Sequence, residues 1–363
     1  MNVGILTYHD ALSYGARLQT LALQECIRHL GHEVSIIDYR GNVHKPMHWY
    51  DVLHTRSPWG LVSRFNQYNT DRAFRGFNQK FYRLSAPCLT EEELRSVTQG
   101  LDAIVVGSDQ VWQLRNFREG RRFDLNYFLH FVQNPVRRVA YAASFGHDLP
   151  LARIGEELDD IKKFDFLSIR EGKAASELAA LLKRDVGHVC DPTLLWGREG
   201  FDSLLPRIEG EPRNVFYFSL SPQGKRDGEI IDAACRLFRE DVVLESRPLR
   251  MCLKGRNFIG NPLQWINAIR SARFVLTNSF HGTVFSILYH RPFLFLSWAN
   301  EGQNVRIKEL LNKLNLTDRI LTDTGTVETQ INTLTTPIQW GQVDDTLSAW
   351  RRTSRDFLQH ALA

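Results

Sequence analysis

The segment from Thr277 to Thr283 carries the residue types best suited to chemistry. It follows an apolar run typical of a buried strand and opens a helical pattern. The first turn of a helix favours an anion, and a histidine placed there, His281, can exchange protons near neutral pH. The segment therefore predicts a phosphate or carboxylate site. A helix cap with a structural histidine is the alternative interpretation.

A second polar segment, residues 168–171, also follows a predicted strand and contains Arg170. A guanidinium can bind a phosphate or carboxylate through two hydrogen bonds, so Arg170 is a candidate anion ligand. We expect it to act from the opposite domain, across a cleft from His281. A surface ion pair between Arg170 and Glu171 is the alternative interpretation.

Two further segments carry residues that can contact a sugar. In residues 107–112, Asp109 can orient a hydroxyl or take its proton, and Trp112 can stack on a sugar ring. Residues 8–15 follow the first predicted strand and form another candidate wall of the site. The alternatives are a loop cap for the former and an ordinary strand-to-helix loop for the latter.

Standard sequence fingerprints are absent. The chain has no GxGxxG after its first strand, no GxxxxGK[ST], no HExxH and no GxSxG. Nicotinamide chemistry, P-loop phosphoryl transfer and zinc proteolysis are therefore disfavoured. The histidines do not pair with carboxylates or cysteines at metal-ligand spacing, so no metal is expected.

Apolar periodicity predicts the elements that must position these segments. Strand, helix and strand patterns at residues 3–7, 18–30 and 34–37 form a βαβ unit, which implies a parallel sheet. A second alternating series begins near Val215, and residues 90–93 indicate a helix that starts with a capping box. In such sheets ligands bind beyond the carboxyl ends of the strands, where the polar segments lie.

The predicted fold class is therefore α/β, with two Rossmann-like domains facing across a cleft. We expect an acceptor-side domain over residues 1–195 and a donor-side domain over residues 196–335. A C-terminal helix within residues 336–363 is expected to pack back on the first domain.

The N-terminus lacks the features of a signal peptide, and no run of about eighteen apolar residues is present. The five cysteines are scattered without a CxxC spacing, as is typical of a reducing compartment. The sequence therefore predicts a cytoplasmic protein. A net charge of +4 is too small to imply a nucleic-acid partner.

Residues 40–81 are rich in basic and aromatic side chains, with Asp51 and Asp71 as their only acidic residues. One interpretation is a surface for anionic lipid head groups at the inner membrane face, or for a phosphate-bearing acceptor. The other is an amphipathic helix that packs its phenylalanines on the sheet and leaves the basic residues in water.

Six ordered segments together resemble the polysaccharide pyruvyl transferase family, across roughly residues 2 to 320. They are GILT with YG and LQ (within 4–19), VGSDQVW (106–112), YAASFG (141–146), SIRE (168–171), DPTLL (191–195) and TNSFHG (277–282). Several matches in family order are far more specific than any one of them.

The resemblance implies a glycosyltransferase-B-like pair of domains and phosphoenolpyruvate as donor, a co-substrate rather than a cofactor. It implies that pyruvate joins two hydroxyls of a sugar as a ketal, with release of phosphate. The acceptor would be a cell-surface polysaccharide, such as an exopolysaccharide or capsule, or its lipid-linked precursor. The resemblance also implies that His281 is catalytic and that Arg170 binds the donor.

On this interpretation the catalytic residues are His281, Arg170 and Asp109. The donor-binding residues are Asn278, Ser279, Gly282, Thr283, Arg306 and Lys308. The acceptor-binding residues are Tyr8, His9, Asp10, Tyr14, Ser108 and Trp112. Several characterised family members carry a basic residue at the position of Ser279. Either Arg306, Lys308, Arg247 or helix amides supply the missing charge here, or the donor differs.

Two other functions stay open at this point. One is a glycosyltransferase of the same architecture that uses a nucleotide sugar, although no segment for binding the base is evident. The other is a carbohydrate-binding protein that kept the fold without catalysis.

Overall fold

The computed structural model describes most of the chain. The described residues are 1–41, 48–55, 57–117, 120–146, 154–155, 157–208, 210–220, 225–239, 242–246, 256–298, 302, 304–321 and 326–363. Lys45, Arg56 and Arg247, which the sequence places among the basic candidates, lie outside the described residues.

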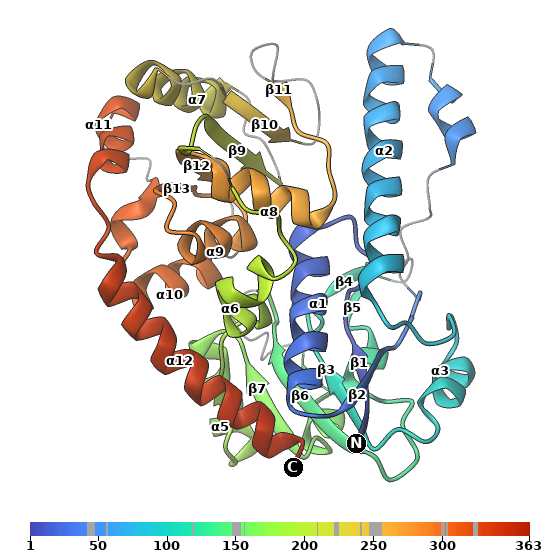
Figure 1. The fold of residues 1–363 in the computed structure, drawn as a ribbon. Coiled ribbons are helices and arrows are strands. Elements are labelled where there is room, and N and C mark those ends of the chain that lie inside the picture. The colour runs from blue at the N-terminus through green and yellow to red at the C-terminus, as the bar shows by residue number, and fades with distance from the viewer. Residues whose placement is uncertain are drawn as a thin grey trace. The chain divides into compact units, whose positions relative to one another are not determined.

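The chain divides into two compact units (Figure 1). Unit 1 comprises Met1–His44, Phe81–Gly197 and Asp345–Ala363. Unit 2 comprises Lys45–Lys80 and Arg198–Asp344.

Unit 1 is built on a six-stranded sheet whose neighbouring strands are all parallel. The strand order is β2 (Glu33–Ile36), β1 (Asn2–Leu6), β3 (Ala103–Val106), β6 (Arg137–Ala143), β7 (Phe166–Ile169) and β8 (Gly187–His188). Its helical segments are α1 (Tyr14–His29), α3 (Glu91–Thr98), η2 (Leu125–Phe128), α4 (Glu157–Lys162) and α5 (Gly172–Leu182). A short antiparallel hairpin, β4 (Arg115–Phe117) and β5 (Gly120–Arg122), follows β3.

Unit 2 repeats this plan with a second six-stranded parallel sheet. The strand order is β11 (Arg256–Asn257), β10 (Val242–Ser246), β9 (Val215–Ser219), β12 (Phe274–Thr277), β13 (Phe293–Leu296) and β14 (Ile320–Leu321). Its helical segments are η1 (Trp49–Leu53), most of α2 (Pro58–Phe81), α7 (Lys225–Phe238), α8 (Pro262–Ser271), α9 (Phe280–Leu288), α10 (Val305–Lys313), η5 (Thr317–Arg319), α11 (Val327–Asn332) and η6 (Thr333–Thr335).

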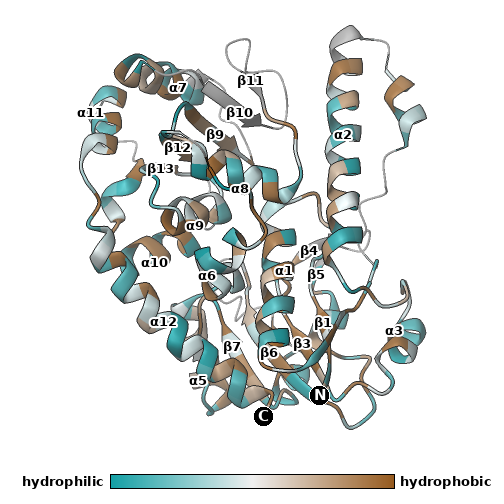
Figure 2. Ribbon diagram, in the orientation of Figure 1, coloured by the Kyte–Doolittle hydropathy of each residue, from teal (hydrophilic) through white to brown (hydrophobic). Residues whose placement is uncertain are grey.

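The sheet of unit 2 is buried on both faces. Successive side chains of a strand point to opposite sides of the sheet, and on each side they pack against a helix. On β9, Val215 and Tyr217 belong to a core cluster that includes Ile230 of α7. Phe218 points the other way and packs edge-on against Trp265 of α8, with ring centroids 5.1 Å apart. Figure 2 shows the same pattern in colour, with hydrophobic residues concentrated on the central strands.

Helix starts follow local chemistry. Ser13 caps α1 by accepting a hydrogen bond from Ala16 N, and Asn261 with Gln264 forms a capping box at α8. The capping box predicted at Thr90 and Glu93 is confirmed at α3. Gly31, with a positive φ of 88°, follows the end of α1.

Two helices cross from one unit into the other. The first, α6 (Pro192–Asp202), is interrupted at Gly197, which has a φ of 72° and a ψ of −177°. Glycine adopts this backbone conformation readily because it lacks a Cβ. The second, α12 (Trp340–Ala361), has Trp340 stacked on His290 in unit 2. Farther along, Ser354 Oγ accepts a hydrogen bond from Cys190 N in unit 1. The C-terminal part of the chain therefore stabilises the β8 end of the first sheet.

Candidate functional site

The helix α9 begins directly after β12, and Ser279 caps it. The Oγ of Ser279 accepts a hydrogen bond from Gly282 N at 3.3 Å, and the Ser279 N–H donates to Thr277 Oγ1 at 3.1 Å. These bonds fix the turn between strand and helix. The first turn of α9 therefore directs its amides and its dipole toward the carboxyl end of β12, where they favour an anion.

Gly282 and Thr283 serve the packing of this turn. A Cβ at Gly282 would approach Thr277 Oγ1 to 2.5 Å, so glycine allows α9 to lie this close to β12. Thr283 is fully buried, and its hydroxyl donates to Ser279 O at 3.1 Å. The Thr283 hydroxyl therefore already has a partner inside the helix, and the predicted donor contact of Thr283 stays a prediction.

Asn278 ties the ends of three neighbouring strands together. Its Oδ1 accepts a hydrogen bond from Leu220 N, and its Nδ2 donates to Ser219 Oγ, both at 2.8 Å. Its carbonyl oxygen accepts from Trp298 Nε1, also at 2.8 Å. The side chain of Asn278 thus links the ends of β9 and β12, and its backbone carbonyl links β12 to the residues after β13, a positioning role beside the predicted donor site.

Asn304 places the start of α10 beside α9. Its Oδ1 accepts from Trp298 N at 2.8 Å, and its Nδ2 donates to Trp298 O at 3.0 Å. Two residues later, the guanidinium carbon of Arg306 lies 5.8 Å from the centroid of the Phe280 ring, a cation–π contact. A permanent positive charge therefore stands at the first turn of α9. Lys308, by contrast, is exposed on α10.

His281 lies in the first turn of α9 and is 7% exposed. Its ring meets the Phe280 ring edge-on, with centroids 5.2 Å apart. The aromatic ring of Phe280 thus contacts both the imidazole of His281 and the guanidinium of Arg306. An imidazole and a guanidinium therefore each contact one phenyl ring at the first turn of α9.

A second polar cluster lies at the strand ends of unit 1, around Arg170. The guanidinium of Arg170 is 2.8 Å from Asp191 Oδ2, 3.7 Å from Asp109 Oδ1 and 3.8 Å from Glu171 Oε1. Burial lowers the pKa of Arg170, but Asp191, Glu171 and Asp109 outweigh it and leave the pKa raised. The surface pair of Arg170 and Glu171 is wrong as an interpretation, because both side chains are 2% exposed.

This cluster carries more negative than positive charge. Asp109, Glu171 and Asp191 face one guanidinium, and Asp191 is further held by Ser108 Oγ at 3.2 Å. Asp109 is the most exposed of the three carboxylates, at 17%, and its Oδ1 also accepts from Gln110 N at 2.8 Å. The cluster suits hydroxyl groups better than a phosphate.

The loop after β1 is held by two ion pairs. His9 Nε2 lies 2.9 Å from Asp38 Oδ1, and Arg40 is 2.7 Å from Asp38 Oδ2. Burial raises the pKa of Asp38, but hydrogen bonds from His9 and Arg40 outweigh it and lower the pKa to about 2. Asp10 pairs with the buried Arg17 at 3.1 Å. His9 is 2% exposed and serves this network, and its contact with an acceptor stays a prediction.

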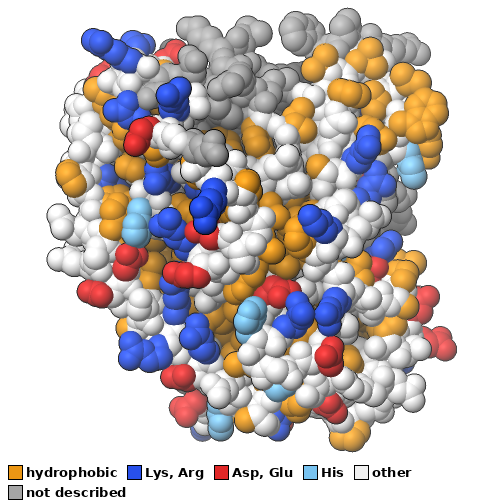
Figure 3. Space-filling model, in the orientation of Figure 1, with side chains coloured by type: hydrophobic (Ala, Val, Ile, Leu, Met, Phe, Trp, Pro, Cys, Tyr) orange, Lys and Arg blue, Asp and Glu red, His pale blue; other side chains and the backbone are white. Residues whose placement is uncertain are grey.

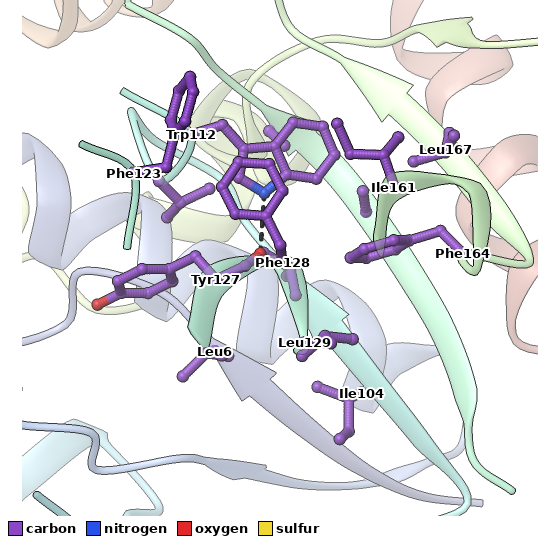
Figure 4. Packing of buried hydrophobic residues seen from close by; sticks show 14 of the residues in the cluster. Leu6, Ile104, Trp112, Phe123, Tyr127, Phe128, Leu129, Ile161, Phe164 and Leu167 are labelled. Atoms are coloured by element: carbon purple, nitrogen blue, oxygen red, sulfur yellow. Dashed lines mark hydrogen bonds between the residues drawn. The ribbon is translucent and has the colours of Figure 1, made fainter. Parts of the chain in front are cut away.

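Two further residues predicted to contact the acceptor, Trp112 and Ser108, are buried, and that contact stays a prediction. Trp112 is fully buried, and its ring stacks on Phe128 with centroids 5.2 Å apart (Figure 4). Its Nε1 donates to Tyr127 O at 2.8 Å, the dashed line of Figure 4. Ser108 is also fully buried, with its hydroxyl near Asp191 and Ala142 O. Trp112 is part of the core, and Ser108 positions Asp191.

Tyr8 and Tyr14 flank the same loop. Tyr8 is half-buried, and its ring meets that of Tyr127 edge-on at 4.8 Å. Tyr14 begins α1 and is 2% exposed. Their contact with an acceptor stays a prediction, as does that of Asp10.

Within the described residues, no group of three or more His, Cys, Asp or Glu side chains is arranged to hold a metal ion. Nor does any helix of the described chain combine the length and apolarity needed to cross a bilayer.

A family model, described as polysaccharide pyruvyl transferase, matches residues 14–300, most of the chain. The chain belongs to the polysaccharide pyruvyl transferase family. The Arg170 cluster and the first turn of α9 fall within the matched region, and Asn304 and Arg306 lie just beyond it. No curated protein matches the sequence at a significant level.

Solved structures show the fold of this family member. The UDP-GlcNAc 2-epimerase of Methanocaldococcus jannaschii matches with a TM-score of 0.52 and 11% identity, over 93% of this chain and 92% of that one. The UDP-GlcNAc 2-epimerase of Neisseria meningitidis gives 0.51 and 10%, over 98% and 94%. An α-glucosyltransferase in complex with UDP and DNA gives 0.52 and 10%, over 100% and 95%. The predicted glycosyltransferase-B-like α/β fold is confirmed.

The structure also identifies residues that sequence reasoning did not assign. Trp298 and Asn304 connect the β13 end of this family member to α9 and α10, and Asp38 with Arg40 fixes the loop after β1. Asp38 directly follows the second predicted strand (34–37), and Trp298 follows β13 by two residues. The strand-end rule would therefore have selected both.

Proposed function

We propose that this chain transfers pyruvate from phosphoenolpyruvate to two hydroxyls of a glycan, with the start of α9 as the donor site. One observation carries the proposal: His281 and Arg306 both contact Phe280 at the capped N-terminus of α9. Phosphoenolpyruvate carries a phosphate and a carboxylate next to a carbon that must be protonated. The cluster offers cationic and amide groups for the first two and an imidazole for the third.

In the proposed donor complex, Arg306 takes the place of the basic residue that other family members carry at Ser279. Its guanidinium is fixed because Asn304 fixes the start of α10. The α9 amides bind the second anionic group, and Asn278 holds the strand ends that shape the site. Lys308 is exposed and contributes only long-range charge.

The proposed reaction begins when the protonated His281 gives its proton to the methylene carbon of phosphoenolpyruvate. The adjacent carbon becomes an oxocarbenium-like centre, and a sugar hydroxyl adds to it. The bond from that carbon to the phosphate oxygen then breaks, and a second hydroxyl closes the ketal. Of the two hydroxyl protons released, one restores His281 and the other leaves with the phosphate, so atoms and charges balance.

The Arg170 cluster belongs to the acceptor side in this proposal. Its excess of carboxylates repels a multiply charged donor but accepts hydrogen bonds from sugar hydroxyls. Asp109, the most exposed of them, takes the first hydroxyl proton and passes it to the departing phosphate, which restores the carboxylate. Arg170 itself holds the carboxylates in place rather than binding phosphate.

The proposed acceptor is a repeat unit of a cell-surface polysaccharide, either polymerised or still lipid-linked. The proposed compartment is the cytoplasm, supported by cysteines that are scattered and lack a CxxC spacing.

The test is mass spectrometry of candidate acceptors after incubation with phosphoenolpyruvate, with phosphate release measured in the same samples. The expected result is the added mass of one pyruvate ketal for each phosphate released. A heavy-oxygen label at the bridging position of phosphoenolpyruvate should appear in the phosphate, because the carbon–oxygen bond breaks. Label retained in the glycan would contradict the mechanism.

Parallel incubations with UDP-sugars address the second candidate, which the UDP-bound structural neighbours favour. A glycosyl mass gain with UDP-sugars, and no change with phosphoenolpyruvate, would replace the proposed reaction by glycosyl transfer.

A further inference from the structure

The N-terminal half of α2 and the preceding η1 expose an unusual concentration of apolar side chains. Six of the fourteen large apolar side chains that are exposed in the described chain fall between residues 49 and 65, so they form a patch rather than a scatter. The patch consists of Trp49, Tyr50, Leu53, Leu61, Val62 and Phe65, exposed by 66%, 47%, 64%, 39%, 47% and 55%. Figure 3 shows these orange side chains gathered at the upper right, over η1 and α2.

Helical spacing shows that α2 has two different faces. Leu61, Phe65, Tyr68 and Arg72 follow one another at intervals of four, three and four residues and therefore share a face. Phe74 and Phe77 lie about half a turn away at 3.6 residues per turn, and they are 0% and 2% exposed. The later part of α2 thus buries its phenylalanines on one face, and the other face stays in solvent.

The segment η1 is fixed to α2 as part of the same surface. Arg64 of α2 donates a hydrogen bond to Asp51 O at 2.8 Å. The Tyr50 ring stacks on His48 at 5.1 Å and meets Trp49 edge-on at 6.0 Å. Tryptophan and tyrosine with one apolar and one polar end are the side chains that settle at membrane interfaces.

The charge around this patch is basic. Arg72 and Lys80 are exposed along α2. The two acidic residues of the segment are both engaged: Asp71 with Arg75 at 3.1 Å, and Asp51 with the His48 N–H at 2.7 Å. An apolar patch with exposed basic side chains farther along the same helix matches an anionic lipid surface, with acyl chains for the patch and head groups for the basic residues.

We propose that η1 and the exposed face of α2 dock this protein on an anionic bilayer. The apolar patch enters the head-group region, and Arg72 with Lys80 contacts lipid phosphates. The sequence left two interpretations open for residues 40–81. Burial of phenylalanines holds for the later part of α2, and the lipid surface is the one proposed for η1 and the N-terminal half of α2. The inference stands on this surface alone and does not depend on the proposed reaction.

The test is sedimentation of the full chain with vesicles of phosphatidylcholine alone or mixed with phosphatidylglycerol. Binding is expected on the mixed vesicles, falling as salt rises, because the basic contribution is screened. Trp49→Ser combined with Phe65→Ser should weaken binding at least tenfold, since it removes two large apolar side chains. Arg72→Glu should weaken it about fivefold or more on anionic vesicles only.

Matched controls replace side chains of the same kind elsewhere. One control is Leu181→Ser, at a side chain that is 40% exposed on α5. The other is Arg352→Glu, at an exposed side chain on α12. Both variants are expected to bind vesicles as the native chain does. Circular dichroism of each variant reports on folding.

Sedimentation of the native chain with neither vesicle would overturn the proposal. So would equal binding by the native chain and the Trp49/Phe65 variant. If light scattering showed a dimer that this double substitution dissolves, the patch would be an interface between two copies rather than a membrane surface.

Discussion

The two strand-end clusters use the same position in the same kind of sheet, yet their electrostatics are opposite. Around Arg170, three carboxylates at 2.8 to 3.8 Å surround one buried guanidinium. At the start of α9, by contrast, an imidazole and a guanidinium share one phenyl ring, next to helix amides. Position at a strand end therefore identifies a polar cluster, but the balance of charge decides what it can bind.

The difference also separates structural from chemical roles. In the Arg170 cluster, the charged groups satisfy one another, so removing one leaves the others buried and uncompensated. At α9, hydrogen bonds from Asn278, Ser279 and Asn304 hold the turn and the start of α10. Substitutions in the first cluster should therefore act on stability, and substitutions of His281 and Arg306 on turnover.

The largest predicted effect, and the one that tests this comparison most directly, concerns His281. His281→Ala should lower the turnover of phosphoenolpyruvate about a hundred- to ten-thousandfold, because a general acid is lost. The thermal unfolding midpoint should change little. His290→Ala is the control, because His290 lies just after α9 and pairs with Asp344 on the surface. Near-normal turnover of His281→Ala would remove His281 from the chemistry.

Arg170→Met should give the next largest effect, a loss of stability. Removing the one cation leaves Asp191 and Glu171 buried without compensation, at a cost of about 3–5 kcal/mol in the free energy of unfolding. Denaturant titration measures this, and Asp191→Asn in the same chain should recover part of the loss. A stable Arg170→Met variant with a much higher KM for phosphoenolpyruvate would instead make Arg170 a donor ligand, as the family resemblance implies.

The fold was predictable because its determinants are local. Apolar runs such as Ala103–Val106 give buried strands, and Thr90 with Glu93 gives a helix start, without reference to distant residues. The start of α9 was predictable for the same reason, since Ser279 and His281 lie beside a strand in the sequence.

Burial was the part that local patterns could not give. Trp112 follows a strand as a sugar-stacking residue would, but Phe128, 16 positions later, covers its ring. Asp191 and Arg170 are 21 residues apart, and only the pairing of β7 with β8 brings them together. Likewise, the cation–π contact of Arg306 with Phe280 depends on the hydrogen bond between Asn304 and Trp298. The residues between these two carry no sequence pattern that would predict this bond.

Arg306→Gln sharpens the comparison at the donor side. If its guanidinium supplies the charge that Ser279 lacks, the KM for phosphoenolpyruvate should rise roughly tenfold or more, because a charge-assisted hydrogen bond is lost. Lys308→Gln is the matched control on the same helix, and its KM should stay within about twofold because an exposed charge contributes little. Equal effects from both variants would indicate long-range attraction of the donor rather than a bound contact.

The smallest predicted effect compares two helix caps. Ser279→Ala and Thr90→Ala each remove a side-chain oxygen that accepts from a first-turn amide, at 3.3 Å and 3.2 Å, so each should cost about 1 kcal/mol of stability. Only Ser279→Ala should also slow turnover, because the α9 turn carries His281 and the α3 turn carries no proposed donor contact. Steady-state rates beside denaturation midpoints separate the two. If both variants lost stability but neither lost rate, the geometry of the α9 cap would matter for folding alone, and the donor would have to bind away from that turn.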